Sequence, residues 1–364
     1  MGFRCGIIGL PNVGKSTIFN ALTAAGAAVA NYPFCTIEPN VGVVAVPDRR
    51  LELIAQRVKP QRVTPTVMEF LDIAGLVKGA SRGEGLGNKF LGHIREVDAV
   101  VHIVRCFDNP DVVHMDGTID PARDIEIVKT ELLLADLETL ERRIAKTEKA
   151  AKAGDRAAAK SLEVYAALKD ALGRGLPAYT LSLGGEAGEA LKDLHLLTAK
   201  KVLYVANVSE KELRGGGTYI EKVRQVAARD GAGMVVICGD LEAEMAELDP
   251  EERQAFLEDL GLEESGLVKL IREGYSLLDL ITFYTTVGPE LRAWTIPRGT
   301  RAPQAAGKIH SDMERGFIRA EIIHFDEFMA AGGMAQAKEK GLIRSEGKDY
   351  EIKDGDIALF RFNV

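Results

Sequence analysis

The chain has 364 residues, of which 46 are lysine or arginine and 54 are aspartate or glutamate, so its formal net charge is −8. At roughly 150 residues per domain this length predicts two or three domains. Hydrophobic residues make up 46% of the chain and charged residues 27%, which is typical of globular proteins and excludes disordered or collagen-like structure.

Membrane insertion and disulfide bonding are not expected. No apolar run approaches the ~18 residues that cross a bilayer, and the first residues lack the apolar region of a signal peptide. The four cysteines have neither disulfide-framework nor metal-ligand spacing, and most of them lie in apolar, strand-like runs. We therefore expect a cytoplasmic protein in a reducing compartment, without a membrane partner.

Charge is unevenly distributed along the chain. Residues 240–264 hold eleven acidic side chains and one basic one. Residues 141–160 hold seven basic and three acidic side chains, and residues 291–320 hold six basic and two acidic ones. A charged run is often only a solvated face, but two basic runs also suit a polyanionic partner such as RNA. The net charge of −8 therefore does not exclude a nucleic-acid partner.

The apolar residues 3–8 predict a buried parallel strand. They lead directly into the sequence GLPNVGKST at residues 9–17, and then into a stretch with apolar residues at helical spacing. Strand, glycine-rich loop and helix form the setting in which the phosphate-binding motif GxxxxGKS operates. We expect a nucleotide to bind this loop through Asn12, Val13, Gly14, Lys15, Ser16 and Thr17.

The residue types of this loop suit phosphate binding. Gly9 and Gly14 allow the backbone to curl so that its N–H groups point at the phosphates, and the helix N-terminus adds its dipole. Lys15 neutralises the β and γ oxygens, and the Ser16 hydroxyl is a ligand for Mg²⁺. Lys15 is thus a candidate catalytic residue, and Ser16 a candidate metal ligand.

Two further segments supply the other parts of such a site. Thr36 lies in a polar stretch suited to a switch loop that offers a second hydroxyl to Mg²⁺, although a loop threonine can also be structural. A strand expected at residues 67–71 ends in Asp72, where an aspartate would hold magnesium. The N–H of Gly75 can meet the γ-phosphate. The glycine-rich residues 78–88 suit a segment that orders when that phosphate is present.

One position departs from the pattern of signalling GTPases. These enzymes carry, directly after the glycine of DxxG, a glutamine that orients the attacking water. Here the residue is Leu76, whose side chain can neither donate nor accept a hydrogen bond. Either the protein binds nucleotide without hydrolysing it, or another group positions the water. His114 is a candidate for that catalytic role, and the alternative is a surface histidine without a role.

A third strand-like run, residues 202–206, ends in Asn207-Val208-Ser209-Glu210. Doubly wound sheets bind ligands at this end of their strands. A guanine reader at such a place is normally Asn-Lys-x-Asp, but here Val208 replaces the lysine and the longer Glu210 replaces the aspartate. A glutamate would crowd guanine, and adenine lacks the two donors that an aspartate accepts. We therefore expect Asn207, Val208 and Glu210 to bind ATP in preference to GTP.

The middle and the end of the chain have different patterns. Leucines spaced three and four residues apart between residues 124 and 172, with a break at Gly154, predict an antiparallel helical hairpin with a coiled-coil seam and a basic tip at residues 146–160. Further on, residues 281–287 and 291–296 are β-rich runs joined by Gly288-Pro289, which is a hairpin signature.

Together these motifs resemble the YchF group of Obg-like ATPases, in the translation-factor branch of P-loop NTPases. The resemblance spans essentially the whole chain. It is carried by GLPNVGKST at 9–17, NYPFCTIEPN at 31–40, DIAGLVKGASRGEGLGN at 72–88, NxxE at 207–210 and RAWTIPRGTRAPQAAGKIHSDMERGFIRA at 292–320.

This resemblance implies Mg²⁺-dependent ATP hydrolysis, ribosome association and a switch cycle. It implies that a hydrophobic residue is normal at the position of Leu76, and that His114 orients the water. It also implies that the residue at the position of Val208 contacts adenine, and that Asn12 matches a residue tied to K⁺ binding in related NTPases.

The implied fold is α/β: a P-loop NTPase with a doubly wound sheet, an inserted antiparallel coiled-coil hairpin and a C-terminal β-grasp (TGS, ubiquitin-like) domain. We place the NTPase domain at residues 1–123 and 200–279, the helical insertion at 124–199 and the TGS domain at 280–364. In a TGS module His310, which could be catalytic in isolation, is expected to organise a turn or to contact RNA.

The expected function is that of an ATPase switch that hydrolyses ATP to ADP and phosphate and binds the ribosome, at its large subunit. The TGS domain and the hairpin would contact rRNA or tRNA. Two alternatives stay open: a nucleotide-gated adapter for RNA or the ribosome, in which hydrolysis is incidental, and a GTPase of the same fold.

Overall fold

The computed structural model describes residues 3–26, 40–73, 86–112, 117–181 and 193–363, and these form two compact units. One unit contains the described residues up to 42 and from 69 to 274, and the other contains residues 43–68 and 275–363. Segment 43–68, which we expected within the NTPase domain, thus groups with the C-terminal residues. The three-domain division itself stays a prediction. None of the described helices is long and apolar enough to cross a membrane.

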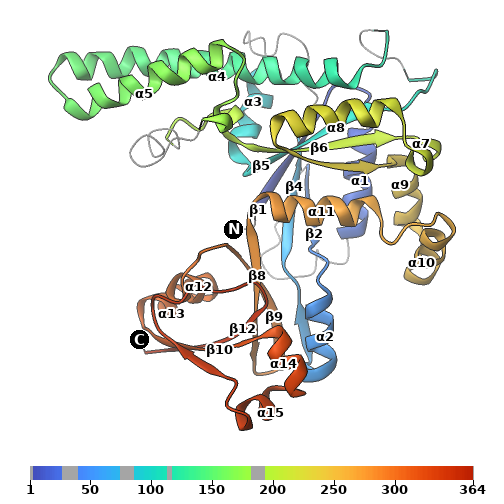
Figure 1. Cartoon of the computed structure of the whole chain (residues 1–364), viewed down its shortest axis with the longest axis vertical. Helices are drawn as coiled ribbons and strands as arrows, with labels where there is room; N and C mark the ends of the chain where they lie inside the picture. The colour runs from blue at the N-terminus through green and yellow to red at the C-terminus, as the bar shows by residue number, and fades with distance from the viewer. Residues whose placement is uncertain (1–2, 27–39, 74–85, 113–116, 182–192, 364) are drawn as a thin grey trace. The chain divides into compact units, whose positions relative to one another are not determined.

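The first unit contains the parallel strands of a six-stranded sheet, whose strand order is β2-β4-β1-β5-β6-β7 (Figure 1). Strands β1, β5, β6 and β7 run parallel, with Cys106 opposite Val208 and Asn207 opposite Ile237. The carboxyl ends of these strands therefore meet at one edge, as in other doubly wound sheets. The strands are β1 (Phe3–Ile8), β2 (Val41–Ala45), β4 (Val67–Asp72), β5 (Ala99–Cys106), β6 (Lys201–Val208) and β7 (Gly233–Ile237).

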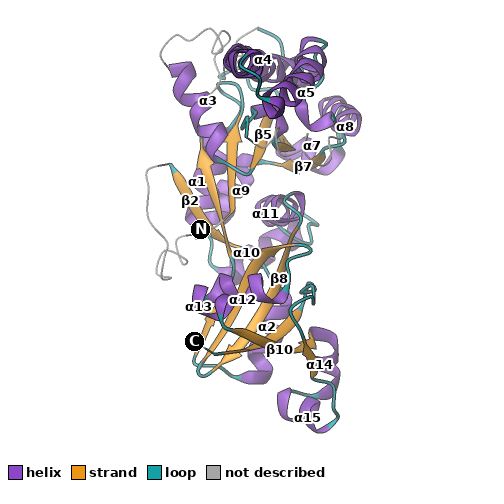
Figure 2. Cartoon of the chain, turned by 90° about the vertical axis from the view of Figure 1, so that its left-hand side faces the viewer, coloured by secondary structure: helices purple, strands orange, loops and turns teal. Residues whose placement is uncertain are grey.

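Helices lie on both sides of the parallel strands (Figure 2). Every residue of β5 is buried, as expected of a strand covered on both faces. Apolar side chains of α8 pack with those of β5 and β6 in one core cluster. The helices of this unit outside the hairpin are α1 (Lys15–Gly26), α3 (Leu86–Glu96), α7 (Glu210–Gly215), α8 (Thr218–Asp230), α9 (Gly239–Glu247), α10 (Pro250–Asp259) and α11 (Gly266–Leu277).

Helices α4 (Pro121–Lys152) and α5 (Arg156–Gly173) form the expected hairpin and lie side by side (Figure 1). Gly154 turns the chain with a φ of +95°, and Asp155 caps α5 by accepting hydrogen bonds from two backbone N–H groups. The hairpin has its own core, which contains the leucines of the predicted seam: Leu133, Leu140, Leu168 and Leu172, with Tyr165.

The base of the hairpin is tied to the chain that follows it. Asp136, 1% exposed, accepts hydrogen bonds from the N–H groups of Leu197 and Thr198 and from the Thr198 hydroxyl. Burial raises the pKa of Asp136, and these three donors oppose that rise. They lie in the short 3₁₀ turn Leu197–Ala199, directly before β6, so the hairpin is fastened next to the strand that it precedes.

The second unit contains a six-stranded sheet of order β11-β10-β12-β8-β9-β3. The expected hairpin is present, because β8 and β9 pair antiparallel around Gly288, whose φ is +64°. Core clusters cover both faces of the sheet. Its strands are β3 (Arg62–Thr64), β8 (Leu280–Val287), β9 (Glu290–Pro297), β10 (Phe317–His324), β11 (Arg344–Glu346) and β12 (Asp356–Phe362).

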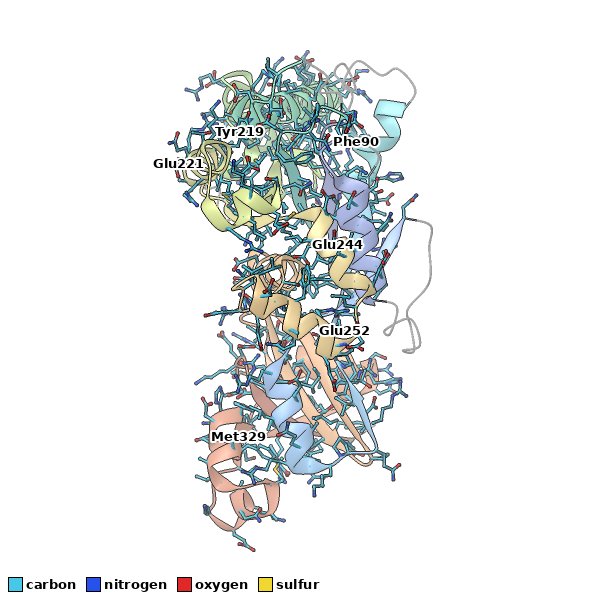
Figure 3. The ribbon with its side chains drawn as sticks, turned by 90° about the vertical axis from the view of Figure 1, so that its right-hand side faces the viewer. Phe90, Tyr219, Glu221, Glu244, Glu252 and Met329 are labelled. Atoms are coloured by element: carbon cyan, nitrogen blue, oxygen red, sulfur yellow. The ribbon has the colours of Figure 1, made fainter. Side chains whose placement is uncertain are left out.

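The helices of this unit are α2 (Arg49–Val58), α12 (Ala302–Ile309), α13 (Ser311–Arg315), α14 (Phe325–Ala331), which carries Met329, and α15 (Met334–Glu339) (Figure 3). His310 organises a turn, as expected, since its Nδ1 accepts the N–H of Asp312 at the start of α13. The assignment of residues 280–364 as a TGS domain stays a prediction.

Segment 43–68 is fastened to the C-terminal residues by pairing and by ion pairs. Strand β3 pairs in parallel with β9. The Arg50 guanidinium donates to both carboxylate oxygens of Asp354, at 2.8 and 3.2 Å. The Tyr284 hydroxyl donates to Asp48 at 2.5 Å. These long-range contacts explain why the segment belongs with residues that lie more than 200 positions away.

Candidate active site

The glycine-rich loop connects β1 to α1. Gly14 has a φ of +85°, and a Cβ atom there would lie 2.1 Å from the Asn207 side chain. A Cβ atom on Gly9 would lie 2.6 Å from the backbone oxygen of Ile103. Both positions therefore require glycine, one for its backbone conformation and both for the close approach of neighbouring strands. Asn12, which is exposed, also has a positive φ of +62°.

A cavity of about 620 Å³ lies at the carboxyl edge of the parallel strands, beside this loop. It is bounded by the phosphate-binding loop and the start of α1, by the loop after β5, by the end of β6 and by the start of α9. Its lining residues are Leu10, Pro11, Asn12, Gly14, Lys15, Ser16, Thr17, Phe107, Asp108, Asn109, Val112, Asn207, Val208, Ser209 and Asp240.

Lys15 and Asp72 are in contact at this site. The Lys15 Nζ donates to Asp72 Oδ1, and both side chains are largely buried, with 12% and 19% exposure. Lys15 begins α1, and Asp72 ends β4, so two elements 57 residues apart place the pair. The sequence assigned Lys15 to phosphate and Asp72 to magnesium, and the fold brings these two side chains together.

The residues present fit a magnesium ion. Magnesium prefers hard oxygen ligands and usually keeps several waters, so that few protein groups suffice. Ser16 is exposed at the cavity, and the Asp72 carboxylate is bonded to Lys15, the residue directly before Ser16. Among the described residues, no group of three or more His, Cys, Asp or Glu gathers into a metal site of its own.

Asn207 links the two ends of the cavity. Its Nδ2 donates to the Val13 backbone oxygen, and its Oδ1 accepts the N–H of Gly239, both at 2.9 Å. The side chain is 4% exposed. Its role in this structure is therefore to hold the phosphate-binding loop against the start of α9. Asn207 also lines the cavity, and its predicted contact with the nucleotide stays a prediction.

Of the other residues of the NxxE motif, two line the cavity and Glu210 does not. Val208 lines the cavity, and so does Ser209, whose N–H and hydroxyl both bond the Glu212 carboxylate. Glu210 is not among the lining residues, and it forms an ion pair of 3.0 Å with Arg214 on the exposed side of α7. The crowding of guanine by Glu210 therefore gains no support from this geometry.

Two further segments form part of the cavity wall. One is the segment Phe107–Asn109 with Val112, which follows the buried strand β5, and the other is Asp240 at the start of α9. The dipeptide Asn109-Pro110 after a buried strand is a turn signal. The side chain that holds this turn is Arg105, which is 2% exposed and lies inside β5.

Four site residues named from the sequence lie outside the described residues. These are Thr36, Gly75, Leu76 and His114. Thr36 as a metal ligand, Gly75 as a donor to the γ-phosphate and His114 as the group that orients the water stay predictions. So does the consequence of having Leu76 where signalling GTPases have a glutamine.

The buried cysteines of this unit and its buried His102 are uncharged. Burial raises the pKa of Cys5 to about 12, with Asp98 adding to the rise. Burial also raises the pKa of the Cys106 and Cys238 thiols. These three cysteines are therefore inert apolar side chains, as expected. Burial lowers the pKa of His102 to about 3, with the Lys129 charge adding to the effect, so that this imidazole is neutral.

Comparisons with known proteins agree with this architecture. Residues 4–150 match a family model described as a 50S ribosome-binding GTPase, and residues 280–363 match the C-terminal model of YchF-type GTPases, described as a protein of unknown function. The chain is similar to the "Ribosome-binding ATPase YchF" of Bacillus subtilis, at 53% identity over 366 residues, and to that of Escherichia coli O157:H7, at 54% over 364 residues. Both alignments cover 100% of each chain.

A solved structure is also similar. The structure of the Schizosaccharomyces pombe YchF GTPase matches with a TM-score of 0.90 and 36% identity, covering 99% of this chain and 98% of that one. The similarity therefore extends over both units rather than over the phosphate-binding loop alone.

Proposed function

The chain belongs to the YchF family, and from that premise we propose that it is a Mg²⁺-dependent ATPase that acts as a nucleotide switch on the ribosome. It is a P-loop nucleoside-triphosphate hydrolase. The observation that carries the proposal is the Lys15–Asp72 ion pair beside a cavity lined by the phosphate-binding loop. We propose a cytoplasmic location for it, in keeping with ribosome binding.

Lys15 is proposed to hold the β- and γ-phosphates. Its ammonium is already at the mouth of the phosphate-binding loop, where Asp72 holds it. A triphosphate would attract the ammonium away from this single carboxylate, since it carries more negative charge. The backbone N–H groups of the loop, aimed by the left-handed conformation of Gly14, would then stabilise charge as the terminal bond breaks.

Ser16, Asp72 and Thr36 are the proposed magnesium ligands. When bound, magnesium would neutralise the charge that develops on the β- and γ-phosphate oxygens. Gly75 would donate its N–H to the γ-phosphate, and His114 would orient the attacking water in place of a glutamine at Leu76. A potassium ion near Asn12 stays a prediction.

ATP is proposed as the preferred nucleotide over GTP. A guanine reader needs a carboxylate that accepts from the base, but Glu210 is paired with Arg214 instead. Val208, which stands where a guanine reader has lysine, lines the cavity and would offer the base an apolar contact. Titration of the apo protein with ATP and with GTP tests this preference. Tighter binding of GTP would favour the alternative of a GTPase with the same fold.

The ribosome is the proposed partner, with contacts to the large subunit through rRNA or tRNA. The relatives in B. subtilis and E. coli are named ribosome-binding ATPases. At the tip of the hairpin, the side chains of Lys146, Lys149, Lys152, Arg156 and Lys160 are exposed. Such a cluster of cations on a projecting element suits a phosphate backbone.

Single-turnover hydrolysis separates a switch ATPase from an adapter in which hydrolysis is incidental. We expect the wild-type protein to convert bound ATP to ADP, and His114→Ala to do so more slowly by about 10²-fold or more, as for other positioned general bases. Unchanged turnover in His114→Ala would remove His114 from the mechanism. Absence of turnover in both proteins would favour the adapter.

A further inference from the structure

A short loop after β5 forms one wall of the nucleotide cavity and has little backbone pairing of its own. Phe107, Asp108, Asn109 and Val112 line the cavity. Within the loop, the Asn109 side chain accepts the N–H of Asp111 at 2.9 Å, and the Asn109 backbone oxygen accepts the N–H of Val112 at 3.2 Å. These bonds define the turn, but they leave the backbone oxygens of Phe107 and Val112 to find donors elsewhere.

Arg105 supplies those donors. Its Nε donates to the Phe107 oxygen at 3.2 Å, its Nη1 to the Val112 oxygen at 3.0 Å and its Nη2 to the Asn109 oxygen at 3.2 Å. Its guanidinium carbon lies 4.8 Å from the centre of the Phe107 ring. One planar group therefore holds the beginning, the middle and the end of the loop in one arrangement.

Arg105 is buried, so it contributes neither to solubility nor to the charge of the surface. It is 2% exposed, within a strand whose eight residues are all buried. Burying a guanidinium is costly unless its donors are satisfied, and an apolar residue would suit this strand at less cost. The donors are satisfied by the loop and not by the sheet, so the loop is what the arginine serves.

The strand register places this loop at the end of the cavity where the base is proposed to bind. Cys106 lies opposite Val208 in the parallel pair β5–β6, so the residues that follow, Phe107 and Ser209, leave the sheet side by side. Both line the cavity. Movement of the loop would therefore change the wall next to Val208, away from Lys15 at the phosphate end.

We propose that Arg105 is a positioning residue for nucleotide binding, which sets the wall of the cavity on the side of the base. The proposal rests on the proposed function, because it requires that ATP occupies this cavity. It predicts a defect in binding that ATP and ADP share, since both carry the same base and ribose.

The test compares Arg105→Lys and Arg105→Met with the wild-type protein. A lysine keeps the charge but cannot reach three oxygens in one plane, and a methionine removes all donors. If the loop holds its binding arrangement only about a tenth of the time, the apparent Kd rises about tenfold. We expect that rise for both ATP and ADP in Arg105→Lys and a larger one in Arg105→Met, with KM rising more than kcat falls.

Asp136→Asn is the matched control. Asp136 is as deeply buried and also bonds three groups of a loop, but that loop does not line the cavity. It should lower the melting temperature without changing the Kd for either nucleotide. If Arg105→Met does not fold, Arg105→Lys is followed by amide hydrogen exchange, in which the N–H groups of Asp111 and Val112 should exchange faster than in the wild type.

Two outcomes are distinguishable. A wild-type protein that binds neither ATP nor ADP would overturn the proposed function itself. A wild type that binds them, together with folded Arg105 variants whose Kd values stay within about twofold of it, would overturn only the role of Arg105.

Discussion

Lys15 and Asp72 illustrate how single residues compete within this site. The ammonium that should bind phosphate is held by the carboxylate that should bind magnesium. If phosphate and magnesium bind as proposed, each of them has to break this ion pair. Asn207 acts differently, since both ends of its side chain are bonded to backbone and it fixes the distance between two loops. At the residue scale, the site contains a charged pair proposed to exchange partners and a side chain that holds the cavity wall.

Replacing Asp72 by asparagine should have opposite effects with and without magnesium. Without metal, the variant should bind ADP more tightly, by about fivefold, because Lys15 loses a partner that is worth about 1 kcal/mol and the phosphates lose a repelling charge. With magnesium, hydrolysis should fall because a metal ligand is lost. Calorimetric titration in EDTA measures the first effect, and phosphate release measures the second.

Asp240→Asn is the control for that prediction, since it removes a carboxylate that lines the same cavity and is not bonded to Lys15. It should not slow hydrolysis to the same extent. Equal behaviour of the two variants would show that general charge, and not the ion pair, accounts for the effect.

His102 should make the protein less stable in mild acid. Its pKa is lowered by burial to about 3 in the folded protein and is near 6.5 when the chain is unfolded. Between these values the unfolded state binds the extra proton, so stability is lost as the pH falls below about 6.5, by up to about 1.4 kcal/mol per pH unit. The free energy of unfolding, measured with urea at pH 7 and at pH 5, should differ less between these pH values in His102→Phe than in the wild type. The exposed His93 offers a control, and His93→Gln should keep the wild-type dependence.

At the scale of elements, the hairpin behaves as a small domain with its own core. Its two helices share a leucine seam, and its base is fastened by Asp136 to the turn before β6. Further ion pairs join α4 to α8, including Lys129 with Asp230 at 3.0 Å. The tip can therefore present charge far from the sheet while the base stays fixed to the strand that carries Asn207.

The stability of the hairpin should depend on the leucine side chains that face its core and not on those that face solvent. Leu168→Ala removes a fully buried side chain and should cost about 2–5 kcal/mol of stability in the hairpin. Leu134→Ala, at a position with 46% exposure on α4, should cost less than about 0.5 kcal/mol. Circular dichroism during thermal unfolding measures both. Similar losses in the two variants would contradict the packing described for the seam.

At the scale of the molecule, the net charge of −8 is the sum of separate regions. Most of the acidic residues of segment 240–264 lie on α9 and α10, where Glu244 and Glu252 are found (Figure 3). The basic tip of the hairpin lies on α4 and α5. A polyanionic partner would meet the tip and avoid the acidic helices, so the total charge does not govern association.

Ribosome binding should depend on salt through the tip. Co-sedimentation should weaken as salt rises, because phosphate contacts release counterions. Replacing Lys149 and Lys152 by glutamine should lower binding and reduce that salt dependence. The exposed lysines Lys59 and Lys211, changed in the same way, should leave sedimentation as in the wild type. Equal sedimentation of both double variants would place the docking surface elsewhere.

The local patterns of the sequence determined much of this protein. Strand, glycine loop and helix, the leucine seam and the β8–β9 turn are encoded by residues that are neighbours in the chain, so that their spacing predicts their conformation. The candidate residues for phosphate and magnesium followed from the same motifs. Lys15, Ser16, Asn12 and Val208 all lie at one cavity.

Only the tertiary structure decided which residues that are distant in the chain come into contact. Asn207 bonds Val13 across 194 positions, and Arg50 bonds Asp354 across 304. Segment 43–68 joins the C-terminal sheet through β3, a strand too short to show periodicity. A buried arginine in an apolar strand has no local signature either, because its donors serve a loop whose path depends on the fold. Composition and spacing specify local conformation, whereas such partners are selected by packing between segments that are distant in the chain.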